Sequence, residues 1–384
     1  MRPGTYAHPV SFRADPVAQA ARLAAAGVAT VRLAYAYHSG RWLLSTSDAG
    51  AVADLDAGRW FGPAGPAGRL DPPLVADLAG PATAALTAAG VRTVAWLVGL
   101  HRSAVATTRP DLALRNAFGH PYRHALCPAR PEVVEHAADL VRRAAAVPGV
   151  TGLDLEAFGY LGWAHQGAHD KIGVALRPAD RWLLSLCLCA ACGTEFTAAG
   201  VDPTALAERV RAVVRGQLAE PRPAAPEPAT DAVAALGRPL HDVVLAVRAA
   251  VVRRLVAAAV AAAGDTPVSL RATADPYATD GKAGGDLAGL GALTTGLTVS
   301  NLHGDLPALA ADLAAARPCT RELSAAWSGA VAATPRRDRF TTAYDVALRA
   351  GADAFVLYAY DLMPTDRLDW LRQSARGRQE VPAA

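Results

Sequence analysis

The sequence lacks an excess of charge of either sign. Its 38 basic and 35 acidic residues nearly cancel, which leaves a formal net charge of +3. Proteins that bind nucleic acid usually present a clustered basic face, so we do not expect a nucleic-acid partner. Lysine is almost absent, since only Lys171 and Lys282 occur and every other basic residue is arginine. In so alanine-rich a chain, we interpret this bias as a matter of codon usage rather than of chemistry.

Long hydrophobic runs are also absent. A membrane-spanning helix needs about 20 apolar residues, whereas the alanine-rich run 255–263 is short and follows Arg253 and Arg254. Residues 1–6 do not lead into the apolar core of a signal peptide. We therefore expect a cytoplasmic protein without a membrane partner. The sequence leaves a homo-oligomer open.

Apolar residues are abundant, at 52% of 384 residues, and charged residues make up 19%. This composition excludes global disorder and supplies a sizeable core. The length allows one large domain or two ordinary ones. No glycine-rich phosphate loop follows any apolar run, which argues against a nucleotide-binding sheet.

Short apolar runs alternate with helical stretches along the chain. Seven runs have the composition of buried parallel strands: 29–35, 92–98, 150–156, 267–272, 296–300, 322–327 and 354–360. Most of them follow an Ala/Leu-rich stretch that predicts a helix: 16–26, 81–89, 132–146, 242–263 and 342–350. Most of these helices stop at a glycine, the common C-terminal signal. The repeated order helix, glycine, strand predicts parallel βα units.

Seven or eight such units predict an α/β fold, a single (β/α)8 TIM barrel over residues 1–384 with loop insertions. We expect the eighth strand in 48–73 or near 189–201, where the pattern is weak. One predicted insertion is a cysteine-rich, metal-binding segment around 187–196. The other is a proline-rich mobile loop around 219–232, which is too short to divide the chain into two domains.

Four of the five cysteines form a pattern that is typical of a structural zinc site. They are Cys127 and the C-x-C-x-x-C cluster Cys187, Cys189 and Cys192. Structural Zn²⁺ takes four Cys or His ligands, and clustered cysteines in a reducing compartment favour metal or redox chemistry over disulfides. A disulfide or redox pair and plain buried thiols are the alternatives, and a histidine could replace one cysteine: His124, His165 or His169. The isolated Cys319 is expected to be a small core residue.

Two carboxylates lie in one predicted strand. Because side chains alternate along a strand, Asp154 and Glu156 point to the same side. Acids in an apolar strand are costly unless they face a site or a partner. Catalytic groups of a barrel lie at the C-terminal strand ends, so we predict Glu156 as a general acid with a raised pKa and Asp154 in support. An ion pair to an arginine inside the barrel is the alternative.

The order of these elements resembles the zinc-binding β-galactosidases of glycoside hydrolase family 42, and TIM-barrel glycoside hydrolases more broadly. The match covers about residues 127–196: Cys127, a helix, a strand that ends in Glu156, and the cysteine cluster followed by Glu195-Phe196. The resemblance implies a barrel, a four-cysteine structural zinc site, Glu156 as the acid/base of strand 4, and a carbohydrate substrate.

The chain departs from that family at two positions. The family has Asn before the acid/base, where this sequence has Leu155, and its nucleophile is a Glu at the end of strand 7. Here the comparable strand has its acid, Glu322, at the N-terminal end, where residues support stability rather than catalysis. We expect the second carboxylate to be Asp275, which Pro276 restricts to an extended backbone, with Asp361 in reserve. Either could instead cap a turn.

Aromatic and polar residues at the strand ends suit the apolar faces and polar rims of sugars. The predicted substrate-binding residues are Tyr35, His38, Arg41, Trp96, His101, Tyr160, His303, Trp327 and Tyr358. The main hypothesis is a hydrolase of a small or oligomeric carbohydrate. The alternative is a barrel that binds a carbohydrate or metabolite without cleaving it. A hydrolase with catalytic zinc is disfavoured, because a four-thiolate shell leaves no open position.

Overall fold

The computed structural model describes the chain except residues 47–51, 63–69, 71, 164, 166–170 and 377–384. Eight parallel strands follow one another around a barrel, and the first pairs with both the second and the last. They are β1 (Arg2–Ala7), β2 (Thr30–Tyr37), β6 (Arg92–Val98), β9 (Val150–Glu156), β10 (Val268–Thr273), β12 (Gly296–Asn301), β13 (Glu322–Ser328) and β14 (Ala354–Tyr358). The predicted (β/α)8 TIM barrel is confirmed.

The eighth strand does not lie where the sequence pattern placed it. It is β1, at the start of the chain, whereas 190–198 form helix α6 (Ala190–Ala198). The described part of 48–73 contributes only β4 (Val52–Leu55), which pairs antiparallel with β3 (Gly40–Leu43), and β5 (Gly58–Arg59), which pairs antiparallel with β2. The sequence of β1, Arg-Pro-Gly-Thr-Tyr-Ala, has few β-branched residues and gave no strand signal. Its pairing with β2 and β14 makes it a strand.

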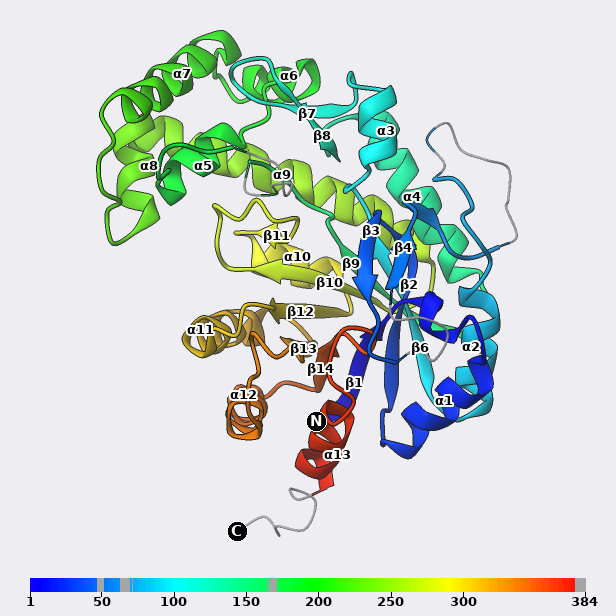
Figure 1. Cartoon of the computed structure of the whole chain (residues 1–384). Helices are drawn as coiled ribbons and strands as arrows, with labels where there is room; N and C mark the ends of the chain where they lie inside the picture. Colours follow the sequence, from blue (N-terminus) through cyan, green and yellow to red (C-terminus); the bar gives the residue numbers. More distant parts are fainter. Residues whose placement is uncertain (47–51, 63–69, 71, 164, 166–170, 377–384) are drawn as a thin grey trace.

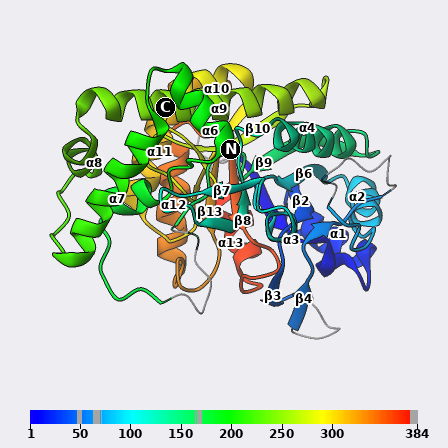
Figure 2. The same cartoon turned by 90° about the horizontal axis from the view of Figure 1, so that it is seen from above.

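Helices surround the strands, as Figure 2 shows from above. They are α1 (Pro16–Ala25), α2 (Ala79–Ala88), α4 (Pro131–Ala145), α9 (Arg238–Ala263), α10 (Leu287–Leu293), α11 (Leu306–Ala316), α12 (Arg337–Arg349) and α13 (Arg367–Arg376). Short 3-10 turns, η1 (Pro9–Phe12) and η2 (Arg317–Cys319), precede α1 and follow α11. The five predicted helices agree with α1, α2, α4, α9 and α12 within a few residues. No helix among the described residues is long and apolar enough to cross a membrane.

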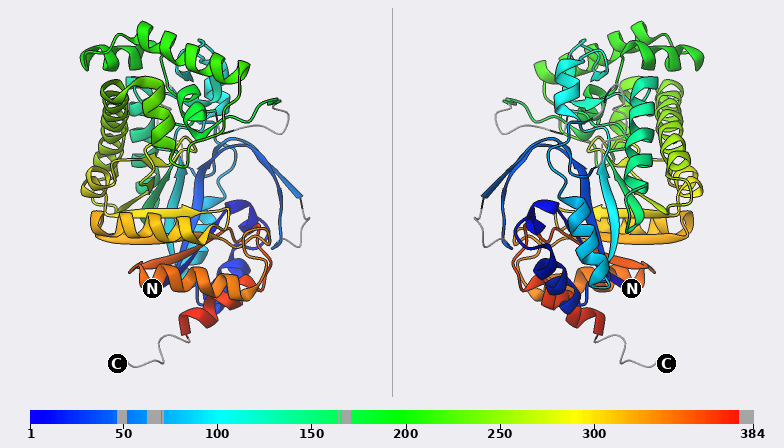
Figure 3. Two further views of the ribbon diagram at one scale, coloured as in Figure 1. Left: turned by 90° about the vertical axis from the view of Figure 1, so that its left-hand side faces the viewer. Right: turned by 90° about the vertical axis from the view of Figure 1, so that its right-hand side faces the viewer.

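Insertions follow several strands at their C-terminal ends. After β2 comes the hairpin of β3 (Gly40–Leu43) and β4; after β6 come α3 (Ser103–Thr108), β7 (Ala113–Arg115) and β8 (Pro121–Leu126). After β9 come α5 (Pro178–Leu184), α6, α7 (Pro203–Ala219) and α8 (Pro228–Leu236), and after β10 comes β11 (Ala283–Gly284). Helices α5–α8 gather at one end of the molecule and the described chain ends lie toward the other (Figures 1 and 3). The insertions therefore build up the C-terminal mouth of the barrel.

The predicted proline-rich loop is shorter than the sequence suggested. Residues 220–227 have no regular structure, but 228–232 belong to α8. The helix begins at Pro228, whose fixed φ angle and missing N–H suit the first helical turn.

A polar network crosses the barrel interior. Asp154 is fully buried, and it accepts hydrogen bonds from Tyr6 Oη at 2.6 Å and Arg32 Nη1 at 3.0 Å. Arg32 also donates to Ser324 Oγ, and Arg271 Nε lies 3.9 Å from Asp154 Oδ2. Buried charges persist only when they are paired and hydrogen-bonded. The network thus joins side chains from strands on opposite sides of the barrel.

Replacing Asp154 by alanine should destabilise the fold, because it leaves Arg32 and Arg271 buried without this carboxylate. Breaking a buried ion pair costs about 3–5 kcal/mol, and urea unfolding of the purified variant measures the loss. Asp139→Ala is the control, since it removes a partly exposed pair with Arg142 on α4. Equal, small losses in both variants would show that the barrel network contributes little.

Candidate active site at the barrel mouth

Glu156 ends β9 at the C-terminal mouth, and its side chain is 29% exposed. Its carboxylate accepts a hydrogen bond from Trp96 Nε1 at 2.5 Å and pairs with Arg271 Nη1 at 2.9 Å. Trp96 is on β6 and Arg271 on β10, the two strands that flank β9. Side chains from both strands that flank β9 therefore orient the Glu156 carboxylate.

Arg271 is the centre of an aromatic group. Its guanidinium lies 4.4 Å from the ring centroid of Tyr6, 5.3 Å from that of Trp96 and 5.8 Å from that of Tyr358, within cation–π range. Burial opposes its charge, but Glu156 and Tyr6 hold the pKa of Arg271 above the ordinary value. Its Nη2 is buried and has no hydrogen-bond partner among the described residues. An acceptor atom of a ligand would satisfy this donor.

Two tyrosine hydroxyls lie beside this group. Tyr37 Oη, from β2, is 3.2 Å from Tyr358 Oη, from β14. Burial raises the pKa of Tyr358, and the negative charge of Glu156 raises it further. Burial likewise raises the pKa of Tyr37. Both side chains are therefore neutral hydroxyls that can donate to or accept from a ligand.

A cavity of about 900 Å³ opens next to Glu156. The ends of β9, β10 and β12 and the helices α5, α8 and α11 supply its walls. Its polar lining includes Glu156, His165, Arg181, Arg271, Asp275, Asp280, Lys282, Asn301, His303 and Asp312, beside the rings of Trp182 and Tyr277. The volume is in the range of small-molecule sites.

Asp275 lines the same cavity as Glu156. Its Oδ1 accepts a hydrogen bond from the backbone N–H of Tyr277 at 2.9 Å, so the carboxylate also caps a turn. Burial raises the pKa of Asp275, and the nearby acids Asp280 and Asp312 act in the same direction. The structure thus brings Asp275 and Glu156 to one cavity.

Asp361, which follows β14, is fully buried. It accepts a hydrogen bond from the backbone N–H of His8 at 2.7 Å and another from Ser11 Oγ. Burial raises the pKa of Asp361 to about 7. It connects the loop after β1 to the loop after β14, and it is not among the residues that line the 900 Å³ cavity.

Histidines group beside the cavity. His101 Nε2 lies 3.1 Å from His165 Nε2, and the ring centroid of His38 lies 4.6 Å from that of His101. His124 lies 5.0 Å from His165, measured between ring centroids. Burial and the neighbouring histidines lower the pKa of His101 to about 2, so its ring is neutral. Among the other predicted substrate-binding residues, Trp96 and Tyr358 surround Arg271, and His303 lines the cavity.

Tyr35 faces away from the mouth. Its Oη lies 2.7 Å from Thr83 Oγ1 on α2. A register shift between Ala34 and Ala36 interrupts the alternation of β2, so that Tyr35 packs outside the barrel while Tyr37 faces the mouth. The sequence pattern cannot show such a bulge.

Three other predicted substrate-binding residues have partners within the protein. Trp327 is buried and its Nε1 donates to Thr334 Oγ1. Arg41 is exposed on the β3–β4 hairpin and pairs with Asp54. Tyr160 is buried beside the cysteine cluster, with its Oη 3.7 Å from Cys192 Sγ.

Arg271, Arg32 and Tyr6 were not among the predicted site residues, although all three belong to the mouth or the network beneath it. The signal that could have found the arginines is their position inside apolar strands, at the centre of Leu-Arg-Ala and Val-Arg-Leu. A charged residue inside such a strand needs a buried partner.

The four cysteines lie together. Cys127 follows β8, Cys187 and Cys189 precede α6, and Cys192 is in its first turn. All four are buried free thiols, and Cys127 Sγ lies 3.5–3.7 Å from the other three sulfurs. Four sulfurs about 2.3 Å from a tetrahedral ion would be about 3.8 Å apart, so the cluster fits a metal ion. His124 and His165 are not part of it, and His169 lies outside the described residues.

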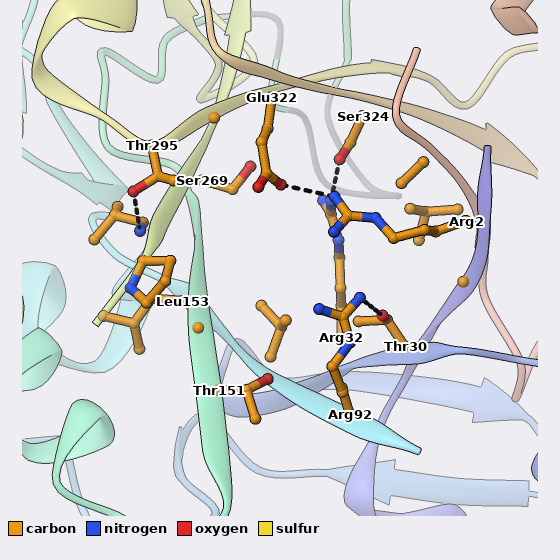
Figure 4. A pocket seen from close by; sticks show the side chains of 18 residues that line it. Arg2, Thr30, Arg32, Arg92, Thr151, Leu153, Ser269, Thr295, Glu322 and Ser324 are labelled. Carbon is orange, nitrogen blue, oxygen red and sulfur yellow. Dashed lines mark hydrogen bonds and ion pairs between the residues drawn. The ribbon is translucent and has the colours of Figure 1, made fainter. Parts of the chain in front are cut away.

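A second pocket, of about 140 Å³, opens at the opposite, N-terminal end of the barrel (Figure 4). Arg2 and Glu322 form an ion pair there at 2.7 Å, and Arg92 donates to Thr30 Oγ1 at 3.0 Å. Glu322 therefore lies at the end of the barrel that supports stability rather than catalysis.

Comparisons with known proteins show the fold. No family model and no curated protein matches the chain. Among solved structures, the PgaB (BpsB) glycoside hydrolase domain from Bordetella bronchiseptica has a TM-score of 0.60 at 14% identity, covering 97% of this chain and 98% of that one. The β-galactosidase from the psychrophilic Marinomonas ef1 has 0.58 at 11%, and α-L-fucosidase isoenzyme 2 from Paenibacillus thiaminolyticus has 0.57 at 12%.

This chain spans 60% of that β-galactosidase and 49% of that fucosidase, and they cover 99% and 98% of it. These solved neighbours are TIM-barrel glycoside hydrolases or domains of them. At such identities the likeness concerns the fold alone. The resemblance to family 42 rests on the order of the cysteines in the sequence.

The buried Asp361 should make stability depend on pH. Burial raises the pKa of this carboxyl from the ordinary 3.8 to about 7. The protonated carboxyl therefore stabilises the fold fully below pH 4, and this stabilisation is lost as the pH rises to about 7, where the buried group ionises. Asp361→Asn cannot ionise. Relative to the unmodified chain, the free energy of unfolding of this variant should therefore rise by on the order of 4 kcal/mol between pH 4 and pH 7. Parallel pH profiles for the two proteins would contradict the assignment.

Proposed function

We propose that this protein is a glycoside hydrolase of a small or oligomeric carbohydrate, with Glu156 as its general acid/base. The observation that supports this most is the position of the Glu156 carboxylate, held by Trp96 and Arg271 at the wall of the mouth cavity. Active sites of TIM barrels lie at this end. The glycoside hydrolases among the solved neighbours support the same reaction class.

The reaction needs a proton donor for the leaving oxygen and a second carboxylate. Glu156 would protonate the glycosidic oxygen and then, as a carboxylate, take a proton from water or stabilise positive charge on the sugar. Arg271, which lines the cavity wall, would stabilise the ionised form. The Tyr37 and Tyr358 hydroxyls offer further hydrogen bonds at the same mouth.

Asp275 remains our choice for the second carboxylate. It lines the cavity next to Glu156, whereas Asp361 is completely buried behind His8 and Ser11. Asp154, one layer below Glu156, would support the site through Arg271, which contacts both carboxylates, and through its hydrogen bond from Tyr6.

We also propose that the four cysteines hold a structural Zn²⁺. The sulfur separations fit tetrahedral thiolate ligation, and a closed four-thiolate shell leaves no position for substrate or catalytic water. The ion would connect the β7–β8 segment to the start of α6. Thiolate ligands suit a reducing compartment, so we retain the cytoplasm as the expected location.

Activity is tested with a panel of aryl glycosides. For any substrate that is cleaved, Glu156→Gln and Asp275→Asn should each lower kcat by about 10²–10⁴-fold, the usual contribution of a general acid or base. The melting temperature of Asp275→Asn should stay close to that of the unmodified chain. Glu156→Gln should melt at a lower temperature, because it leaves the buried Arg271 without its closest carboxylate. Asp139→Asn, on the outer helix α4, is the control with unchanged kcat.

The alternatives give different results. Turnover that survives Asp275→Asn but not Asp361→Asn would assign the second carboxylate to Asp361. Sugar binding without turnover, in a chain that cleaves nothing on the panel, would favour a carbohydrate-binding barrel.

Metal analysis tests the zinc site. The freshly purified, reduced protein should hold about one zinc per chain, and Cys189→Ser should lose it and melt at a lower temperature, because structural zinc contributes to folding. Cys319→Ser is the matched control, since Cys319 lies outside the cluster. A wild-type chain without zinc would refute the proposal.

A further inference from the structure

Arg248 is a buried arginine without a carboxylate partner. It lies on α9, 7% exposed, and makes no ion pair with an acid in the described part of the chain. Its hydrogen bond is a long one, 3.4 Å from Nη1 to the carbonyl oxygen of Ser185. By contrast, Arg32 and Arg271 each pair with an acid in the barrel. A buried cation without an anionic partner is costly, so we expect another source of negative charge close to Arg248.

Tyr160 lies between Arg248 and the cysteine cluster. The Arg248 guanidinium lies 4.1 Å from the centroid of the Tyr160 ring, and Tyr160 Oη lies 3.7 Å from Cys192 Sγ. Burial lowers the pKa of Arg248, while Tyr160 and the cysteine sulfurs act in the opposite direction. The Tyr160 hydroxyl is a hydrogen-bond donor within reach of Cys192 Sγ.

A zinc ion with four thiolates has a net charge of −2, and this charge is buried here. We infer that Arg248 and Tyr160 form the outer shell of the metal site: Arg248 compensates the thiolate charge, and Tyr160 donates a hydrogen bond to Cys192 Sγ. This inference rests on the zinc proposal above. Outer-shell groups of this kind orient the ligands and tune metal affinity.

The same contact connects the metal to the catalytic loop. Tyr160 lies four residues after Glu156, and between them Ala157 has a φ of 57°, a left-handed backbone that non-glycine residues seldom adopt. On one side Leu161 forms a β-bridge with Asp280, and on the other Tyr160 reaches the cysteines. The metal site thus helps to hold the loop that directs Glu156 into the cavity.

The first test measures zinc release from the zinc-loaded full chain to an excess of a chromogenic chelator. Arg248→Met keeps much of the side-chain length but removes the charge. It should lose about 10–100-fold in zinc affinity, the usual effect of losing an outer-shell group, and therefore release zinc to the chelator faster than wild type. Arg248→Lys should restore most of the retention. Arg253→Met, on the same helix with a half-exposed side chain, is the matched control and should behave as wild type.

The second test uses Co²⁺ in place of zinc and reads the sulfur-to-cobalt charge-transfer band. A hydrogen bond stabilises the sulfur lone pairs, so Tyr160→Phe should shift this band to lower energy while the ring beneath Arg248 remains. This variant also tests the shell if Arg248→Met does not fold.

The outcomes separate the two proposals. Normal metal loading with wild-type release from Arg248→Met, or with an unshifted band in Tyr160→Phe, overturns the corresponding part of the outer shell and leaves the zinc site intact. A wild-type chain that takes up neither zinc nor cobalt overturns the metal site and its outer shell together. Neither measurement depends on glycosidase activity.

Discussion

The pairing of acids with arginines inside the barrel is the interaction on which the candidate site depends. Asp154 and Glu156 lie two residues apart on β9 and point to the same side, and Arg271 from β10 lies 3.9 Å from the first and 2.9 Å from the second. Arg32 completes the set from β2. Two carboxylates and two guanidinium groups balance their charges where an unpaired ion would be costly. The deeper pair supports the barrel, and the outer pair holds a carboxylate at the mouth.

The same principle operates at the cysteine cluster. There the buried cation is Arg248, and with the proposed metal bound, thiolates would supply the balancing charge in place of a carboxylate. Tyr160 lies between the two and belongs to the loop after Glu156. The insertion α5–α8 and the barrel mouth are therefore joined chemically as well as by chain connection. A metal bound at the proposed site would in this way influence the geometry of Glu156, the proposed acid/base.

The barrel alone does not identify a reaction, because one fold supports many chemistries. What distinguishes this chain is the combination at one mouth of Glu156, Asp275, an unpartnered Arg271 nitrogen and a ring-lined cavity. Strand β13 ends at Ser328 and has its only acid, Glu322, at the opposite end, so the identity of the second carboxylate decides between the proposed hydrolysis and binding alone.

Much of the architecture was determined by local sequence. Seven strands and five helices were readable because apolar runs, alanine-rich stretches and terminal glycines are local signals, and the cysteine spacing was sufficient to predict a four-sulfur cluster. Strand β1 was not readable, because six residues with a single β-branched side chain, Thr5, become a strand only between β2 and β14. The bulge that turns Tyr35 outward and Tyr37 inward also arises from pairing with β6. The rest was decided by contacts between distant parts of the chain. Arg271 lies beside Glu156, and Arg248 near the cysteines, only because particular strands and helices pack together. Local sequence does not determine which elements pack together.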